Sequence, residues 1–346
     1  MRNILLALLM TTLCVASYAQ IKTEKEIRQE KSALKKLIRK ELVKVPKYSQ
    51  QPIYYLDLAK VSCRVVVKID DIPVNDFIFE DRNGRCSVPI NTYLLGSGEH
   101  VLSMEVYPLS SQTTISPDAR VNSAIVLFHE KDRVQQARME LFSQEEEWIA
   151  DLDMPRSIGE QNLPFYCDSI RFRTVLPFDY SHILTTAKDL RKIPDLESKV
   201  YAYYNKVRDM MIAGEYYEYI QMLSKNIRLW AETSYWTKKD LENTYLYPNS
   251  FFRFNCHVLA WKAFPIENCE MVIDGKGKLV YLRRKDTMDK VLEVEFYTLS
   301  PGEIKYGEYN KKKLFELPFK MGGAMFIVLY MPHDSDELVE LVEAFG

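Results

Sequence analysis

The chain has 346 residues, of which 47% are hydrophobic and 27% charged, and its formal net charge is −2. This length is enough for two domains, and the near-neutral charge argues against a general nucleic-acid binder. The 22 tyrosines and 16 phenylalanines, set against only 12 glycines, favour packed sheet surfaces over flexible repeats.

The N-terminus has the pattern of an export signal. Arg2 precedes an apolar run that begins at Ile4, and Ser17 and Ala19 supply small residues for a cut after Ala19. The run is shorter than the roughly 20 apolar residues that span a bilayer. We therefore expect residues 1–19 to be a cleaved signal peptide and the mature chain to be periplasmic or secreted.

Residues 20–48 are predicted to form a cationic arm, with a helix over 22–44. Residues 21–47 hold ten Lys or Arg and four Asp or Glu, which gives a local charge of +6, whereas residues 48–346 carry −9. Leu34, Ile38 and Leu42 form a sparse apolar stripe that can pack on the body of the protein. The charged face is a candidate for peripheral contact with an anionic membrane or an acidic partner.

Residues 49–180 are predicted to form a β-sandwich, because short strands alternate with turn signals. The expected strands are 63–69, 77–79, 86–90, 92–95, 101–106, 121–128, 138–142 and 170–175. The stretch from Ile90 to Leu102, with its Gly96-Ser97-Gly98 turn, resembles accessory β-sandwich domains of exported bacterial proteins. The acidic segment 144–165, which contains proline, is interpreted as a connection between two domains.

Residues 181–346 are predicted to form an α+β domain in which helices precede a long antiparallel sheet. Leu196, Val200 and Val207 recur with helical spacing, and a second helix begins near Tyr216. Strands are expected at 251–262, 269–274, 278–284, 290–299, 304–309, 313–317 and 324–331, followed by a last helix over 335–345. This order resembles the cone-shaped nuclear transport factor 2-like or cystatin-like fold, so we expect a multi-domain chain, all-β and then α+β.

Nothing in the sequence signals a metal or a cofactor. The five histidines are scattered, and no cysteine lies in a Cys-x-x-Cys pair, so we expect neither a zinc site nor a redox site. Five cysteines remain after cleavage, which leaves at least one unpaired. Cys256 could bridge to Cys269 across a predicted hairpin, and Cys63 with Cys86 is a weaker candidate pair.

The catalytic motifs of the common hydrolases and nucleotide-binding enzymes are missing, because there is no Gly-x-Ser-x-Gly elbow, Walker loop or Gly-x-Gly-x-x-Gly. Candidate pocket residues on the predicted C-terminal strands are His257, Tyr281, Arg283 and Glu295. The more suggestive feature is an aromatic surplus between residues 201 and 247, more than one buried face can hold. Exposed Tyr and Trp side chains favour protein interfaces. The predicted binding residues are Trp236, Tyr235, Tyr217, Tyr204 and Tyr201.

Two function hypotheses follow, with a third behind them. The first is a non-catalytic binding protein outside the cytoplasm that recognises another protein, one specific form being an immunity protein that neutralises an exported toxin. The second is a carbohydrate-binding or surface-attached module, which would present Trp or Tyr on a sandwich face, although residues 52–142 contain no Trp. The third is a hydrolase that uses the pocket residues of the C-terminal domain.

Overall fold

The structure is a computed structural model that describes residues 24–42, 44–74, 81–129, 146–213, 215–246, 258–299 and 318–345. These residues form a mixed α+β structure with three antiparallel sheets. The predicted signal peptide, the predicted strands 77–79, 138–142, 304–309 and 313–317, and residues Cys256 and His257 lie outside the described residues.

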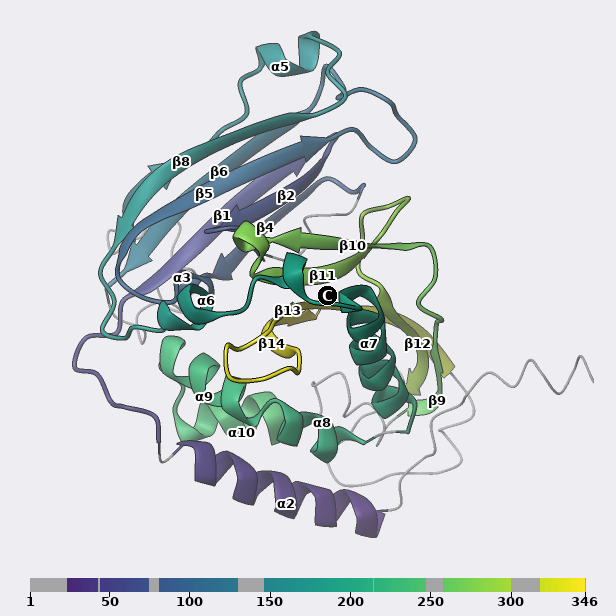
Figure 1. Cartoon of the computed structure of the whole chain (residues 1–346). Helices are drawn as coiled ribbons and strands as arrows, with labels where there is room; N and C mark the ends of the chain where they lie inside the picture. The colour runs from purple at the N-terminus through teal and green to yellow at the C-terminus, as the bar shows by residue number, and fades with distance from the viewer. Residues whose placement is uncertain are drawn as a thin grey trace, which may run out of the picture.

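Two four-stranded antiparallel sheets form one end of the molecule (Figure 1). One has the order β4-β1-β6-β7 and the other the order β3-β2-β5-β8. Their strands are β1 (Ile53–Val61), β2 (Arg64–Ile69), β3 (Ile72–Val74), β4 (Gly84–Pro89), β5 (Gly98–Tyr107), β6 (Arg120–Phe128), β7 (Glu146–Asp151) and β8 (Tyr166–Thr174). Alternate residues of β1 and β5 are buried, so each sheet has one apolar face. The strand predicted at 170–175 is present as β8, which pairs with β5.

The remaining sheet has the order β10-β11-β13-β12-β9, and β14 pairs with β13. Its strands are β9 (Val258–Ala263), β10 (Cys269–Asp274), β11 (Leu279–Arg284), β12 (Leu292–Leu299), β13 (Pro318–Tyr330) and β14 (Val339–Phe345). The strands β10 and β11, predicted at 269–274 and 278–284, are paired as a hairpin through a short 3-10 turn, Gly275–Gly277.

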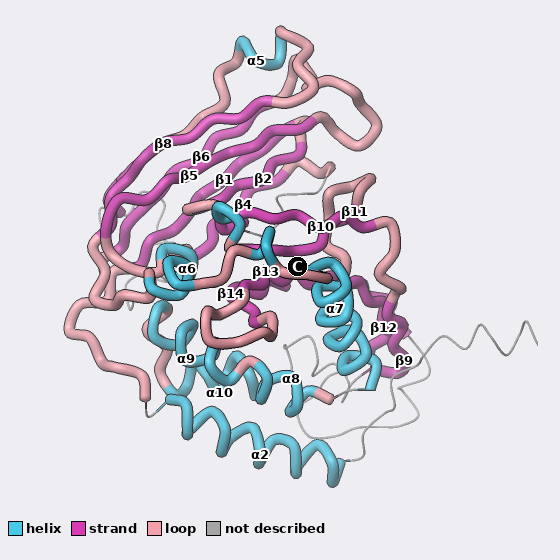
Figure 2. The backbone as a smooth tube through the Cα atoms, viewed as in Figure 1, coloured by secondary structure: helices cyan, strands magenta, loops and turns pink. Residues whose placement is uncertain are grey.

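The five longer described helices gather on the side of the third sheet (Figure 1). They are α2 (Glu24–Leu42), α7 (Leu196–Ala213), α8 (Tyr216–Met222), α9 (Ser224–Thr233) and α10 (Lys238–Leu246). The described residues also form three shorter helices, α3 (Asn91–Leu94), α5 (Ser157–Glu160) and α6 (His182–Thr186), and a 3-10 turn at Leu190–Lys192. Figure 2 shows α8, α9 and α10 between α2 and the strands. Leu34 and Ile38 of α2 are each 1% exposed, as the predicted apolar stripe requires.

Three predictions of secondary structure are wrong. Residues 92–95 are not a strand, because Asn91–Leu94 form the short helix α3, which ends at Leu95 in the left-handed region. The segment 144–165 is not simply a connection, because β7 lies within it and pairs with β6. The expected helix over 335–345 is also absent, because Val339–Phe345 form β14 beside β13.

The two halves of the chain are joined by buried polar contacts. Asn91 on α3 donates from Nδ2 to the carbonyl oxygens of Pro52 (2.9 Å) and Thr233 (3.1 Å), and its Oδ1 accepts from the backbone N–H of Tyr54. Thr233 ends α9, so one buried side chain connects the first sheet to the helical layer. Cys63 and Cys86, which both belong to this first half, do not form the predicted disulfide.

Candidate functional site

Two of the predicted binding residues belong to the core. Tyr204 is 0% exposed, and its hydroxyl donates to the carbonyl oxygen of Ile327 (2.6 Å) and accepts from the N–H of Leu282 (3.1 Å). Tyr235 is 6% exposed. The expectation that these two side chains are offered to a partner is therefore wrong. The third sheet covers Tyr204, and the segments around Tyr48 and Phe178 cover Tyr235.

The tyrosine surplus on α7 has a structural explanation. Tyr201 and Tyr203 are half-buried, and their hydroxyls donate to the carbonyl oxygen of Cys269 (3.4 Å) and to Glu340 Oε1 (2.9 Å). The three tyrosines of α7 thus contact three strands: Tyr201 contacts β10, Tyr203 contacts β14 and Tyr204 contacts β13. Three tyrosines cannot share one face of a helix, but on α7 they all meet the same sheet.

The C-terminal pocket candidates do not converge. Tyr281 is 1% exposed and donates to Asp274 Oδ2 (3.0 Å), while Arg283 Nε donates to Glu270 Oε1 (2.6 Å). Glu295 on β12 pairs with Gly322, whereas β11 pairs with β13 at Leu329 and Tyr330, so these strands meet different parts of β13. His257 lies outside the described residues.

Tyr281 and its neighbours instead belong to a polar junction that the sequence did not indicate. Lys68 on β2 is 8% exposed, and its Nζ lies 2.7 Å from Glu105 Oε1 and 3.1 Å from Asp274 Oδ2. Burial alone would lower the pKa of Lys68, but the hydrogen bond to Glu105 and the charges of Asp274 and Glu105 raise it above its usual value. The junction holds the second sheet against β10 and β11.

Two buried carboxylates are each held by a pair of tyrosines. Glu232 on α9 accepts from Tyr48 (2.5 Å) and from Tyr180, and burial together with that carboxylate raises the pKa of both phenols. Glu340 on β14, 1% exposed, accepts from Tyr203 and from Tyr219 (3.3 Å). No local sequence pattern marks either glutamate, because the partners lie far away along the chain.

The surface that best fits a binding role is the exposed face of α2. At 100° per residue, eight of the ten exposed residues of α2 fall within an arc of about 140°. The eight are Lys25, Arg28, Gln29, Ser32, Lys35, Lys36, Arg39 and Lys40. The other two exposed residues, Glu26 and Lys31, lie about 40° beyond the two edges of this arc. Within the described side chains of α2, the acidic residues Glu26, Glu30 and Glu41 lie outside this arc, so the arc carries cations and no carboxylate.

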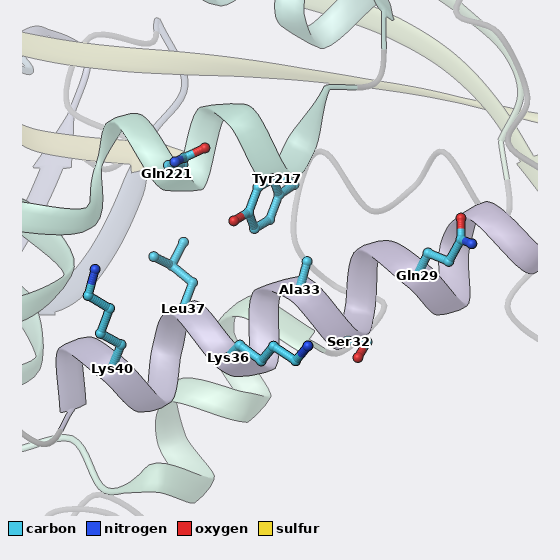
Figure 3. Close-up of a pocket in the computed structure, with 8 residues that line it drawn as sticks. All are labelled: Gln29, Ser32, Ala33, Lys36, Leu37, Lys40, Tyr217 and Gln221. Carbon is cyan, nitrogen blue, oxygen red and sulfur yellow. The ribbon is translucent and has the colours of Figure 1, made fainter.

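A groove runs beside this arc, between α2 and α8. A hollow of about 450 Å³ is lined by Gln29, Ser32, Ala33, Lys36, Leu37 and Lys40 from α2 and by Tyr217 and Gln221 from α8. In Figure 3, Ala33 and Leu37 project from α2 toward α8, and Tyr217 projects back toward α2. A second hollow of about 450 Å³, lined by Lys25, Arg28, Gln29 and Ser32, shares two residues with the first and continues it.

The predicted binding residue Tyr217 therefore lies beside the cationic helix. Its backbone N–H donates to Glu30 Oε1 of α2 at 3.1 Å, which fixes the start of α8 against the arm. Trp236 is half-buried against the core and does not line this groove. The sequence indicated both Tyr217 and the cationic arm, but not that they would meet.

The described residues contain no group of three or more His, Cys, Asp or Glu side chains placed to hold a metal ion. Of the helices in the same part of the chain, none combines the length and hydropathy that a membrane span requires. The chain matches no protein-family model, no curated protein and no solved structure.

Proposed function

We propose that the protein is an exported, non-catalytic binding protein that recognises an acidic protein partner through α2. The observation that carries this proposal is the arc of six basic side chains without a described carboxylate, next to a groove with an aromatic wall. Charges of one sign on one surface steer and select a partner of opposite sign. An immunity protein that neutralises an exported toxin is one specific form of this function.

The same helix is less suited to a membrane surface. An interfacial helix buries an apolar face among the lipids. The apolar residues Leu34 and Ile38 of α2 are already buried against the protein, and Leu37 is partly buried. Contact with anionic lipid would therefore rest on charge alone.

One observation favours the second candidate function, a carbohydrate-binding or surface-attached module. Trp148 on β7 is 63% exposed, and β7 adds it to the sheet that contains β1 and β6. The sequence argument against sugar binding rested on the absence of Trp between residues 52 and 142. For the third candidate, a hydrolase, the described residues give less support, because Tyr281 and Arg283 are occupied by Asp274 and Glu270.

We also propose the finer architecture that the sequence patterns indicated. The two four-stranded sheets would form a β-sandwich, which the alternating burial of β1 and β5 supports. The third sheet, with α7 packed on it, would form the cone-like domain. The export signal at residues 1–19 remains part of this proposal.

The function is tested by capture from the periplasm of the source organism with three forms of the purified mature chain. The first is wild type. The second carries Lys25→Glu, Lys36→Glu and Lys40→Glu, and the third carries the same change at the exposed residues Lys206, Lys276 and Lys285. We expect one acidic protein to be recovered by wild type and by the third form but not by the second, with an affinity that falls as salt rises.

Recovery of the same proteins by all three forms would contradict the proposal. Flotation of wild type with anionic vesicles, together with no captured protein that depends on α2, would replace the protein partner with a membrane surface.

A further inference from the structure

The groove beside α2 combines two hollows, of which the first is lined by both α2 and α8 and the second by α2 residues. Because the two hollows share Gln29 and Ser32, together they follow α2 from Lys25 to Lys40. At 1.5 Å per residue, these 15 steps extend about 22 Å. This length equals about four turns of a helix, whereas an extended strand would cover it with about seven residues.

The floor and walls of the groove differ in chemistry. Ala33 and Leu37 provide an apolar floor toward α8, and the small side chain of Ala33 lets another backbone approach closely. Lys36 and Lys40 stand on one side, and Tyr217 and Gln221 on the other. A partner segment must therefore be apolar on a narrow stripe and acidic beside it, which is the pattern of an amphipathic helix.

The spacing of the cations also favours a helix. Among the cations that line the two hollows, Lys25 and Arg28 are three residues apart and Lys36 and Lys40 are four apart, so each pair is separated by one helical turn, about 4.5 to 6 Å along the axis, and the two pairs by about 12 Å, roughly two turns. Carboxylates spaced three and four residues apart on a second helix recur with the same period and meet them in register. Side chains on one face of a strand recur about every 6.6 Å and lose register over four positions.

From this geometry we infer that the groove between α2 and α8 binds an acidic amphipathic helix of the partner protein. The helix lies along α2, with its apolar stripe on Ala33 and Leu37 and its carboxylates toward Lys25, Lys36 and Lys40. This inference rests on the proposed function and adds the secondary structure of the recognised segment. It selects a helix over an extended peptide.

The test uses two synthetic probes of about 16 residues, the length that fills the groove. Both have the same composition of Glu, Leu, Ala and Gln. In one the glutamates are spaced three and four residues apart beside a leucine stripe, and in the other they occupy every second residue. Binding to the full mature chain is measured by fluorescence anisotropy, and helix formation by far-UV circular dichroism of the peptide in the complex.

We expect the helix-spaced probe to bind about tenfold more tightly, which two or three additional exposed ion pairs would supply. It should gain helical signal on binding. Ala33→Gln, which fills the floor without changing charge, should remove this preference. Lys31→Glu, on the same helix but outside the groove, should leave it unchanged, and circular dichroism of each variant confirms that α2 is still folded.

The inference and the proposed function fail in different ways. If both probes bind with equal affinity and lose it on Lys36→Glu and Lys40→Glu, the surface responds to net charge alone. The proposal of an acidic partner would then be supported, and the inference that the bound segment is a helix would be overturned. If neither probe binds while capture still depends on α2, the helix is again overturned. If capture does not depend on α2 either, both proposals fail.

Discussion

Lys68 shows what a single buried residue contributes to this fold. Its ammonium contacts Glu105 of the same sheet and Asp274 of the third sheet, so three ionised groups share one site that is largely closed to water. Tyr107 donates to Glu105 Oε2 (2.8 Å) and Tyr281 to Asp274, which satisfies the carboxylates further. Such a cluster fixes geometry more than it adds stability, because desolvation offsets much of the attraction.

Removing the cation should therefore be costly. Lys68→Met keeps the side-chain length but leaves two carboxylates close together, and we expect it to lower the free energy of unfolding by about 3–5 kcal/mol. Arg171→Met breaks the exposed pair with Glu99 and serves as the control, with an expected loss of less than about 1 kcal/mol. Urea denaturation of both variants decides the matter. Equal losses of unfolding free energy in the two variants would show that the Lys68 junction contributes no more than an exposed ion pair.

At the scale of the element, α9 is held by contacts made far from its own sequence. Trp230 is 8% exposed and its Nε1 donates to the carbonyl oxygen of Leu341 (3.2 Å), while Asn226 donates to the carbonyl of Glu340. These contacts attach α9 to β14, and Tyr48 and Tyr180 attach the C-terminal turn of α9 through Glu232. The helix is thus a support for both the last strand and the arm.

We expect Trp230→Ala to lower the free energy of unfolding by about 3–5 kcal/mol, because it truncates a large core side chain. Trp148→Ala is the control, since Trp148 is 63% exposed, and its effect should stay within about 0.5 kcal/mol. Thermal unfolding of the two variants provides the comparison. A loss at Trp148 as large as that at Trp230 would mean that β7 is covered in the folded protein.

The element predictions succeeded where the pattern was local. The strands β2 and β5 and the helix α2 follow from alternation and from the 3.6-residue period. The prediction failed for β14 because Leu338, Leu341 and Val342, all buried, have the spacing of a helix as well. The segment forms a strand because it pairs with β13. This pairing has a register shift between Val328 and Leu329, and Glu340 is buried as well. That partner is distant along the chain.

The candidate site shows the same limit. The charge of the arm and the aromatic character of residue 217 could be predicted from the sequence, because composition carries both. The burial of Tyr204 and Tyr235 could not, because it depends on β13 and on the segments around Tyr48 and Phe178 that close over α9.

At the scale of the whole molecule, the tyrosines connect folding to alkaline pH. Burial raises the pKa of Tyr48, Tyr107, Tyr180, Tyr204 and Tyr281 above the usual value. Because the folded state holds these protons more tightly than the unfolded state, their contribution is fully present below about pH 10 and is lost as pH rises through the folded pKa values.

We therefore expect the urea midpoint to be little changed by these phenols below about pH 10, the pKa of unfolded tyrosine, and to fall steadily as the pH rises above it. Tyrosinate absorbance should show that these buried phenols ionise together with unfolding rather than before it. Complete ionisation of the tyrosines near pH 10 in a protein that stays folded would contradict the burial described above.

The attachment of α2 has a consequence for how the chain is synthesised. The hydroxyl of Tyr48 meets Glu232 across 184 residues of sequence, and the other surfaces that receive the arm, α8 and α10, lie in the same stretch. At 5–20 residues per second, α2 leaves the ribosome roughly 10 to 40 seconds before its docking site exists. During that interval α2 lacks the tertiary packing that supplies most of a helix's stability in a protein. The first element of the described chain thus waits for its docking site, and the groove is completed only after most of the chain has been translated.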